Sequence, residues 1–296
     1  GANIVFPISA RQSFTLVPEY RNFYYEFQVT DSQTYSLAAS WNKLLTELTN
    51  VSITGNVRRL EYDEPVIEDV TYTSVFFAIA SRLARSNVTS NLGATLVERD
   101  TGPTAEEFAG NWNWVFQLTG RSSFRFFIAT DLNDTNNAAF NAIVDPGFGD
   151  PNDIQITTDV VSNQALVLGY FFEGRTLQSS LVGQLQNLNY SETPNDRRNR
   201  TLNAAMDYPV SALLTSGLYA RYRHTEFIDA ARTDNDYTVG GNLRFQLSRN
   251  LSSILDLRYR SRTSTQDLQN FDVGSAFVTL VYGFGEPLRP TGAGGF

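Results

Sequence analysis

The chain of 296 residues contains no cysteine, and it has only one histidine and one methionine. The lack of cysteine excludes disulfides, thiolate metal ligands and a cysteine nucleophile. Three further motifs are missing from the sequence: a glycine-rich phosphate loop, a dinucleotide-binding fingerprint and the paired spacing of zinc ligands. We therefore expect neither a metal nor a cofactor.

Long apolar runs are also missing. A membrane-spanning helix needs about 20 predominantly apolar residues in a row, and no segment approaches that length. The mean hydropathy is −0.25, and together these features exclude a helical membrane protein. These features do not exclude a transmembrane β-barrel, because its polar interior positions alternate with its lipid-facing ones and dilute the apolar signal.

Basic residues are fewer than acidic ones, with 23 Lys and Arg against 31 Asp and Glu, and the net charge is −8. This acidic balance argues against binding to nucleic acid, which needs a basic patch or stripe. Arg far outnumbers Lys, and Tyr, Phe, Thr, Ser and Asn are abundant. Aromatic and β-branched residues favour strands, so the composition indicates an all-β protein.

The clearest pattern in the chain is the alternation of its C-terminal part. Apolar and polar residues alternate with period two over 236–247, 251–262 and 272–284. One tight turn and one longer polar loop join the three segments. Alternating segments of about ten residues, separated by turn residues, are the signature of transmembrane β-strands.

Alternation and turn clusters along the whole chain predict about fourteen strands, within a range of about twelve to sixteen. The predicted fold is an antiparallel, up-and-down transmembrane β-barrel over residues 13–284. Residues 1–12 are expected to form an N-terminal periplasmic segment, and residues 285–296 a C-terminal periplasmic tail. The expected strands are 13–30, 33–45, 50–60, 69–82, 87–99, 111–120, 124–131, 158–172, 176–190, 200–208, 212–227, 236–247, 251–262 and 272–284.

The predicted connections alternate between two classes. Tight turns alternate with longer polar or acidic loops, of which 132–157 is the longest. Outer-membrane barrels have short periplasmic turns and longer extracellular loops, so this sorting predicts a protein of the bacterial outer membrane. The 132–157 loop either folds into the lumen as a constriction or extends outside the barrel.

Arginines gather on one face of the last predicted strands, opposite leucines and tyrosines. A charge on the lipid face costs about 2–4 kcal/mol at the bilayer midplane, so we assign the arginines to the lumen. Two interpretations are open: a structural ladder in which they neutralise Asp256, Asp207 and loop acids, or a basic lining that attracts anionic solutes or an acidic polysaccharide. The candidate pore-lining residues are Arg221, Arg223, Arg244, Asp256, Arg258, Arg260 and Arg262.

Aromatic residues concentrate near the ends of the predicted strands. Trp and Tyr are enriched at both membrane–water interfaces, which favours a membrane girdle; a platform on which sugars stack is the alternative. The candidate girdle residues are Trp112, Trp114, Tyr208, Tyr237, Tyr259, Tyr282 and Phe284.

The sequence offers little to carry catalysis. His224 falls on the outward side of its predicted strand, near the rim of the long loops. A Ser–His–Asp triad needs the histidine beside a nucleophile, and the pattern supplies no such geometry, so we expect no enzyme. We interpret the acidic residues in the loops at 63–69 and 145–153 as solvated loop charge; a divalent cation held through their oxygens is the alternative.

Four motifs in the last third of the chain resemble a known family. They are Asp-Tyr-Thr-Val-Gly-Gly at 236–241, Leu-Ser-Arg-Asn-Leu at 247–251, Leu-Arg-Tyr-Arg-Ser-Arg at 257–262 and Phe-Val-Thr-Leu-Val-Tyr-Gly-Phe at 277–284. This part of the chain is similar to the C-terminal part of porin-like outer-membrane β-barrel proteins, of the kind associated with exopolysaccharide gene clusters. In such proteins the closing strand ends the chain at an aromatic residue, whereas here residues 285–296 follow Phe284.

The leading functional hypothesis is porin-like passage of polar or anionic solutes, or export of a polysaccharide. The alternative is a non-conducting structural barrel that anchors a partner complex in the outer membrane. The expected partners are the lipid bilayer and lipopolysaccharide, with a periplasmic or outer-membrane protein as a further partner and no nucleic acid. The sequence carries no signal of oligomeric state.

Overall fold

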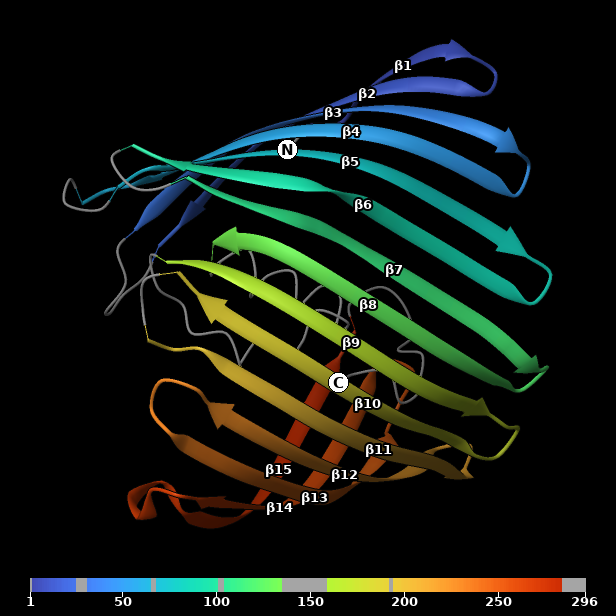
Figure 1. Cartoon of the computed structure of the whole chain (residues 1–296). Helices are drawn as coiled ribbons and strands as arrows, with labels where there is room; N and C mark the ends of the chain where they lie inside the picture. Colours follow the sequence, from blue (N-terminus) through green and yellow to red (C-terminus); the bar gives the residue numbers. More distant parts are fainter. Residues whose placement is uncertain are drawn as a thin grey trace. The chain divides into compact units, whose positions relative to one another are not determined.

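The computed structural model describes residues 2–24, 31–64, 68–100, 104–134, 159–191 and 194–283. These residues form fifteen β-strands and one short 3₁₀ helix, η3 (Asp267–Gln269). The strands follow one another in the sheet in chain order, and the pairings between them are antiparallel (Figure 1). The all-β, up-and-down arrangement predicted from the alternation is confirmed. No helix in the described part of the chain is long and apolar enough to cross a membrane.

Apart from the six-residue β1, each strand has 12 to 15 residues. A tilted transmembrane strand needs about 9–11 residues, so each of these strands is long enough to span a bilayer. The strands are β1 (Ile4–Ser9), β2 (Gln12–Phe23), β3 (Ser32–Thr46), β4 (Thr49–Tyr62), β5 (Val70–Leu83), β6 (Ser86–Arg99), β7 (Ala105–Thr119), β8 (Ser122–Asp134), β9 (Val160–Glu173), β10 (Gln178–Tyr190), β11 (Arg197–Ser211), β12 (Leu214–Phe227), β13 (Arg232–Gln246), β14 (Leu251–Ser264) and β15 (Phe271–Tyr282).

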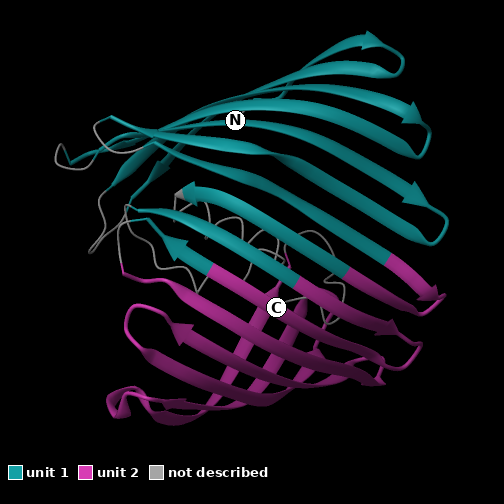
Figure 2. Cartoon of the chain, viewed as in Figure 1, with its two compact units in different colours: residues 1–115, 126–166, 188–193 teal, residues 116–125, 167–187, 194–296 magenta. Residues whose placement is uncertain are grey.

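The chain divides into two compact units (Figure 2). Unit 1 comprises residues 1–115, 126–166 and 188–193, and unit 2 comprises residues 116–125, 167–187 and 194–296. Strands β1–β6 therefore lie entirely in unit 1, and strands β11–β15 lie entirely in unit 2.

Several element boundaries differ from the prediction, and the differences at β1 and β13 affect the strand count and the polar face of unit 2. Residues 4–9, expected in the segment before the barrel, form β1 and pair with β2, which gives fifteen strands in place of fourteen. Strand β13 begins at Arg232, four residues earlier than expected, because the alternation of its polar residues continues through Asp234 and Asp236. The connection before it shortens to residues 228–231, where Ala231 adopts a positive φ of 46°.

Two expected features fall largely outside the described residues. The 132–157 loop is described only at residues 132–134, which belong to β8. The 285–296 tail is not described.

Connections after odd-numbered strands have two to four residues, and those after even-numbered strands have four to 25, so the alternation of tight and longer connections holds with an overlap at four residues.

Within each unit the sheet has an apolar face and a polar face, because successive side chains of a strand point to opposite sides. On the apolar face large hydrophobic side chains are exposed, which would be costly in water and is favourable against lipid. In unit 1 they include Leu37, Ile53, Val57, Val75, Phe77 and Leu92, and in unit 2 Leu202, Leu218, Val239, Leu257 and Leu280.

One end of unit 1 carries a hydrophobic cluster on the polar face. Its residues lie at the strand ends next to the longer connections, and each is less than 8% exposed: Val70, Tyr72, Val97, Leu132 and Val160. The guanidinium of Arg58 lies 4.1 Å from the centre of the Tyr72 ring. Interior positions of a barrel are usually polar, so this end of unit 1 departs from simple alternation.

Candidate functional site: the arginine face of β11–β15

The strand register places the predicted pore-lining residues on one face of unit 2. Arg223 lies opposite Asp236 across β12 and β13, and Asp236 lies opposite Arg262 across β13 and β14. All seven candidates, Arg221, Arg223, Arg244, Asp256, Arg258, Arg260 and Arg262, lie on this polar face, which we call the arginine face. That they line a pore stays a prediction.

Asp236 is the centre of the arginine face. Its carboxylate accepts hydrogen bonds from Arg262 Nε and Nη2 at 2.9 and 3.0 Å. Arg223 Nη2 and Arg260 Nη2 donate to the same carboxylate at 3.2 and 3.3 Å. Three strands thus converge on one acid that is only 5% exposed. Burial makes such charge-assisted contacts stronger than surface ion pairs, provided that the buried charge keeps its partners.

Asp234 is a second acid of the same strand and face. Arg232 Nε donates to its Oδ1 at 2.8 Å, and Arg262 Nη1 lies 3.7 Å from its Oδ2. Neither acid is among the partners predicted for the arginines from the sequence. The signal was present: with period two, positions 234 and 236 share the face of Arg244.

Tyr219 connects β12 to β14 across the intervening strand. Its hydroxyl lies 3.1 Å from each carboxylate oxygen of Asp256, and Arg258 Nε donates to the hydroxyl at 3.0 Å. Arg258 Nη2 also reaches Asp256 at 3.4 Å. The ring lies over Gly240 of β13, where an added Cβ would be 2.4 Å from Tyr219 Cζ. Gly240 therefore provides the room for this connection.

Two phenylalanines on the arginine face of β15 pack against the guanidinium groups. The guanidinium carbons of Arg260 and Arg262 each lie 5.2 Å from the centre of the Phe271 ring. Arg258 lies 5.7 Å from the centre of the Phe277 ring. Distances below about 6 Å are those of cation–π contacts, which explains why this face of β15 is not uniformly polar.

Positive charge exceeds negative charge on this face. Over strands β11–β15 the register assigns to it eight arginines and four aspartates, a net of four positive charges, although the whole chain carries a net charge of −8. The arginines are Arg197, Arg221, Arg223, Arg232, Arg244, Arg258, Arg260 and Arg262, and the aspartates are Asp207, Asp234, Asp236 and Asp256.

Asp207 differs from the other three acids. It is 7% exposed, and its Oδ2 has no hydrogen-bond partner among the described residues. Its Oδ1 lies 2.5 Å from the position that a Cβ of Gly217 would occupy, and the amide of Asn242 lies 2.8 Å from the same point. The ladder interpretation named Asp256 and Asp207 as partners of the arginines; of the two, Asp256 has an ion pair with an arginine in the described structure.

The described girdle candidates lie on the apolar faces and are exposed: Trp112, Trp114, Tyr208, Tyr237, Tyr259 and Tyr282. In unit 1 the indole Nε1 of Trp114 donates to Ser86 Oγ at 2.7 Å. In unit 2 the Tyr259 hydroxyl donates to Asp272 Oδ1 at 3.0 Å. An apolar ring with a bonded polar tip suits a membrane interface. Their girdle role stays a prediction, and Phe284 lies outside the described residues.

His224 lies on the apolar face, with its Nδ1 2.9 Å from Asn235 Oδ1. The described part of the chain contains no group of three or more His, Asp or Glu side chains that could hold a metal ion. The acidic residues at 145–153 lie outside the described residues.

Comparison with known families and structures agrees with this architecture. Residues 197–284, which span β11–β15, match the family described as "Putative beta-barrel porin 2". A comparison with curated proteins found no match.

Several solved structures are similar to the chain. The copper transporter OprC has a TM-score of 0.53 and 11% identity over 91% of this chain and 48% of its own. OmpT, an outer membrane protein of Vibrio cholerae, has a TM-score of 0.44 and 7% identity over 93% of this chain and 98% of its own. An anion-selective porin from Comamonas acidovorans has a TM-score of 0.37 and 10% identity over 92% of this chain and 98% of its own.

The family match covers the residues whose motifs carried the resemblance, and it coincides with the arginine face. The alternating strands and the similarity to OprC agree with the predicted fold, and the exposed apolar faces agree with the predicted location in a membrane. The match over residues 197–284 confirms the expected resemblance to porin-like outer-membrane β-barrel proteins, whereas the association with exopolysaccharide gene clusters stays a prediction.

Proposed function

We propose that the protein lets polar solutes pass through the outer membrane without catalysis, and that it prefers anions. The observation that carries the proposal is the excess of arginine over aspartate on the arginine face of β11–β15. In a barrel the polar face lines the interior, where a net positive wall attracts anions and repels cations. Acidic polysaccharides fall within this class, because planar guanidinium groups match carboxylates.

Exposure supports a role for part of this wall in contacting solutes. The side chains of Arg258 and Arg260 are 45% and 43% exposed, whereas that of Asp236 is 6% exposed. The acids are thus covered by the arginines, and the accessible charge is positive. The exposed leucines and tyrosines of the apolar face support contact with lipid and lipopolysaccharide as the surroundings of the barrel.

A second candidate function is a non-conducting barrel that anchors a partner complex. The pairing of the arginines favours it: three of them share Asp236, and Arg258 bonds both Tyr219 and Asp256. Side chains held in this way stabilise the wall even where nothing passes.

Single-channel recording in planar bilayers separates the two functions. The folded protein should conduct, and its reversal potential in a KCl gradient should show a preference for chloride. Changing Arg244, Arg258 and Arg260 together to Gln lowers the net charge of the arginine face from four to one, so the preference should shift toward potassium.

Arg200→Gln provides the matched control, because Arg200 lies on the opposite face of β11, next to His224 of β12. It should leave the reversal potential unchanged. Heat-modifiable mobility in gels shows whether the protein is folded. If folded protein gives no conductance in bilayers, this result would contradict passage and support the structural barrel. Conductance without a shift in the triple variant would contradict the anion preference.

A further inference from the structure

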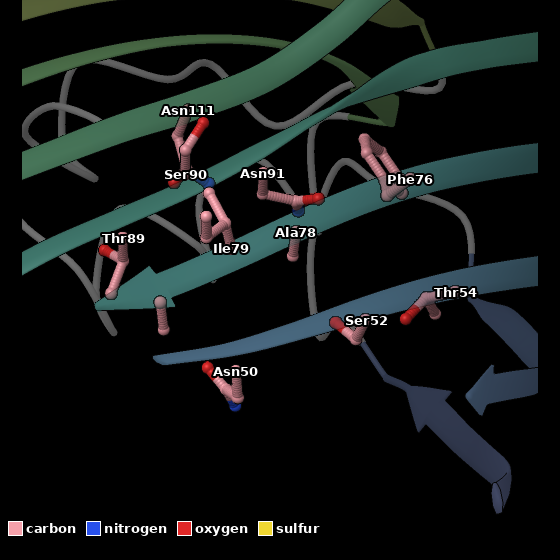
Figure 3. Close-up of a pocket in the computed structure, with 11 residues that line it drawn as sticks. Asn50, Ser52, Thr54, Phe76, Ala78, Ile79, Thr89, Ser90, Asn91 and Asn111 are labelled. Carbon is pink, nitrogen blue, oxygen red and sulfur yellow. The ribbon is translucent and has the colours of Figure 1, made fainter. Parts of the chain in front are cut away.

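A cavity of about 270 Å³ opens on the polar face of unit 1, over strands β4–β7. Figure 3 shows Asn50, Ser52 and Thr54 of β4, with Phe76 of β5, Asn91 of β6 and Asn111 of β7. Among the described residues its lining contains no charged side chain. We call these six residues with Ala78 the asparagine groove.

The register explains why a groove forms here. Ser52 lies opposite Ala78 of β5, and Ala78 lies opposite Asn91 of β6. The small alanine leaves a trough whose two sides carry polar groups, and neighbouring strands about 4.8 Å apart separate those sides by roughly 10 Å. The groove lies toward the ends of β4–β6 that carry the tight turns, because Asn50 is the second residue of β4 after the turn at 47–48. Such turns lie on the periplasmic side of outer-membrane barrels.

Phe76 closes one end of the groove with an aromatic ring. Phe76 lies opposite Gly93, and a Cβ on Gly93 would be 2.6 Å from Phe76 Cδ1 and 2.0 Å from the carbonyl oxygen of Val75. The ring therefore lies over the glycine and extends across β6. Thr54 lies on the other side of Phe76, on β4. The groove thus combines an apolar ring with amides and hydroxyls.

The side-chain oxygen of Asn91 is a second feature of the groove that points to a ligand. This atom, Oδ1, is buried and has no hydrogen-bond partner within the described residues. A carboxamide oxygen accepts hydrogen bonds, and a buried acceptor without a partner is unfavourable until one arrives. Hydroxyl donors satisfy it without bringing charge, which matches the uncharged lining.

We propose that the asparagine groove binds one unit of a neutral, hydroxyl-rich solute, namely a sugar residue. Each sugar hydroxyl both donates and accepts, as the Asn, Ser and Thr side chains of the lining do. The sugar's C–H face packs on Phe76, in the way that ligand sites combine aromatic surface with a few polar groups. An anion lacks a cationic partner in this lining. The proposal adds a binding site to the proposed passage function and does not rest on conduction.

Equilibrium binding to the full chain folded in detergent tests the proposal. The probes are a linear neutral glucose tetramer and a galacturonate tetramer of the same length, each titrated by calorimetry. The neutral tetramer should bind the wild-type chain in the groove, whereas the galacturonate tetramer should bind only at the arginine face, which matches carboxylates. Ala78→Leu fills the trough without removing a polar group, and it should weaken binding of the neutral tetramer at least tenfold.

Two further variants separate the two recognition elements. Asn91→Ala removes the unpartnered acceptor and Phe76→Leu removes the flat ring while keeping apolar volume; each should weaken the neutral tetramer several-fold. Ala38→Leu and Asn56→Ala are the controls, because both residues lie on the same face outside the groove, and neither should change binding.

The outcomes decide the proposal. A folded wild-type chain that fails to bind the neutral tetramer overturns it, as does Ala78→Leu binding as tightly as wild type. Weakening of galacturonate binding by Ala78→Leu to the same extent as binding of the neutral tetramer also overturns it. Because binding is measured in detergent, a silent bilayer contradicts passage and leaves this result unaffected, and the reverse also holds.

Discussion

At the scale of single residues, the arginine face depends on glycines, whose lack of a side chain leaves room for neighbouring groups. Tyr219 reaches Asp256 only because Gly240 lies beneath its ring, and Asp207 and Asn242 share the space above Gly217. In unit 1, Gly93 lies under Phe76 in the same way. A glycine of a strand often marks such a close approach.

Gly240→Ala should destabilise the barrel by about 1–3 kcal/mol, as overpacking does in other well-packed sites. The new Cβ would lie 2.4 Å from Tyr219 Cζ and 2.8 Å from the carbonyl oxygen of Leu257. The second contact is with backbone, so moving the tyrosine alone does not relieve it. Urea unfolding in lipid vesicles, followed by tryptophan fluorescence, measures the change.

Gly274→Ala is the control for this variant. Gly274 lies on β15, opposite Tyr259, and an added Cβ there has nothing within 4 Å among the described residues. It should unfold at the same urea concentration as the wild-type chain. Equal stability of both alanine variants would contradict the role assigned to Gly240.

Asp236→Asn should change stability and selectivity in different ways. Removing the charge leaves Arg223, Arg260 and Arg262 without their common acid, and loss of one partner from a buried ion pair costs about 3–5 kcal/mol. We expect the lower end, because Arg260 is partly exposed. The net charge of the arginine face rises by one, so the preference for chloride should increase. Urea unfolding and the reversal potential test the two effects, and a shift toward potassium would contradict the charge argument.

At the scale of strands, the two faces of each strand face different surroundings. Leu257 lies on the apolar face near the middle of β14, and Thr279 lies on the polar face of β15. Leu257→Arg should cost about 2–4 kcal/mol, because its charge would lie in lipid near the midplane. Thr279→Arg, its control, should cost much less. Folding yields and urea unfolding in vesicles compare the two, and equal costs would contradict the assignment of faces.

The alternation of single strands predicted which residues share a face, and this is why Arg258, Arg260 and Arg262 were grouped correctly. It did not predict their partners, because the register between strands depends on turn geometry and pairing. Asp236 was therefore overlooked, although it begins a predicted strand. β1 was missed because six residues that include Pro7 give too short a pattern. The asparagine groove depends on Ala78 lying between Ser52 and Asn91, which three separate strands supply.

At the scale of the whole molecule, the sign of the charge depends on where it is counted. The chain is acidic, with a net charge of −8, whereas the arginine face has a net charge of four positive units. Acidic residues therefore prevail over the rest of the chain. A preference for anions comes from the charge that a passing ion meets locally, so the isoelectric point of 4.8 does not predict it.

This local origin makes the preference sensitive to salt. The Debye length is about 10 Å at 0.1 M salt and about 3 Å at 1 M, so exposed guanidinium groups such as those of Arg258 and Arg260 influence a passing ion mainly at low salt. Reversal potentials at a fixed salt ratio should show a clear chloride preference when the mean concentration is near 0.1 M. The preference should largely disappear near 1 M. A preference that is equally strong at both concentrations would show that selection occurs by direct contact in a narrow constriction, and it would contradict selection by the field of the arginine face.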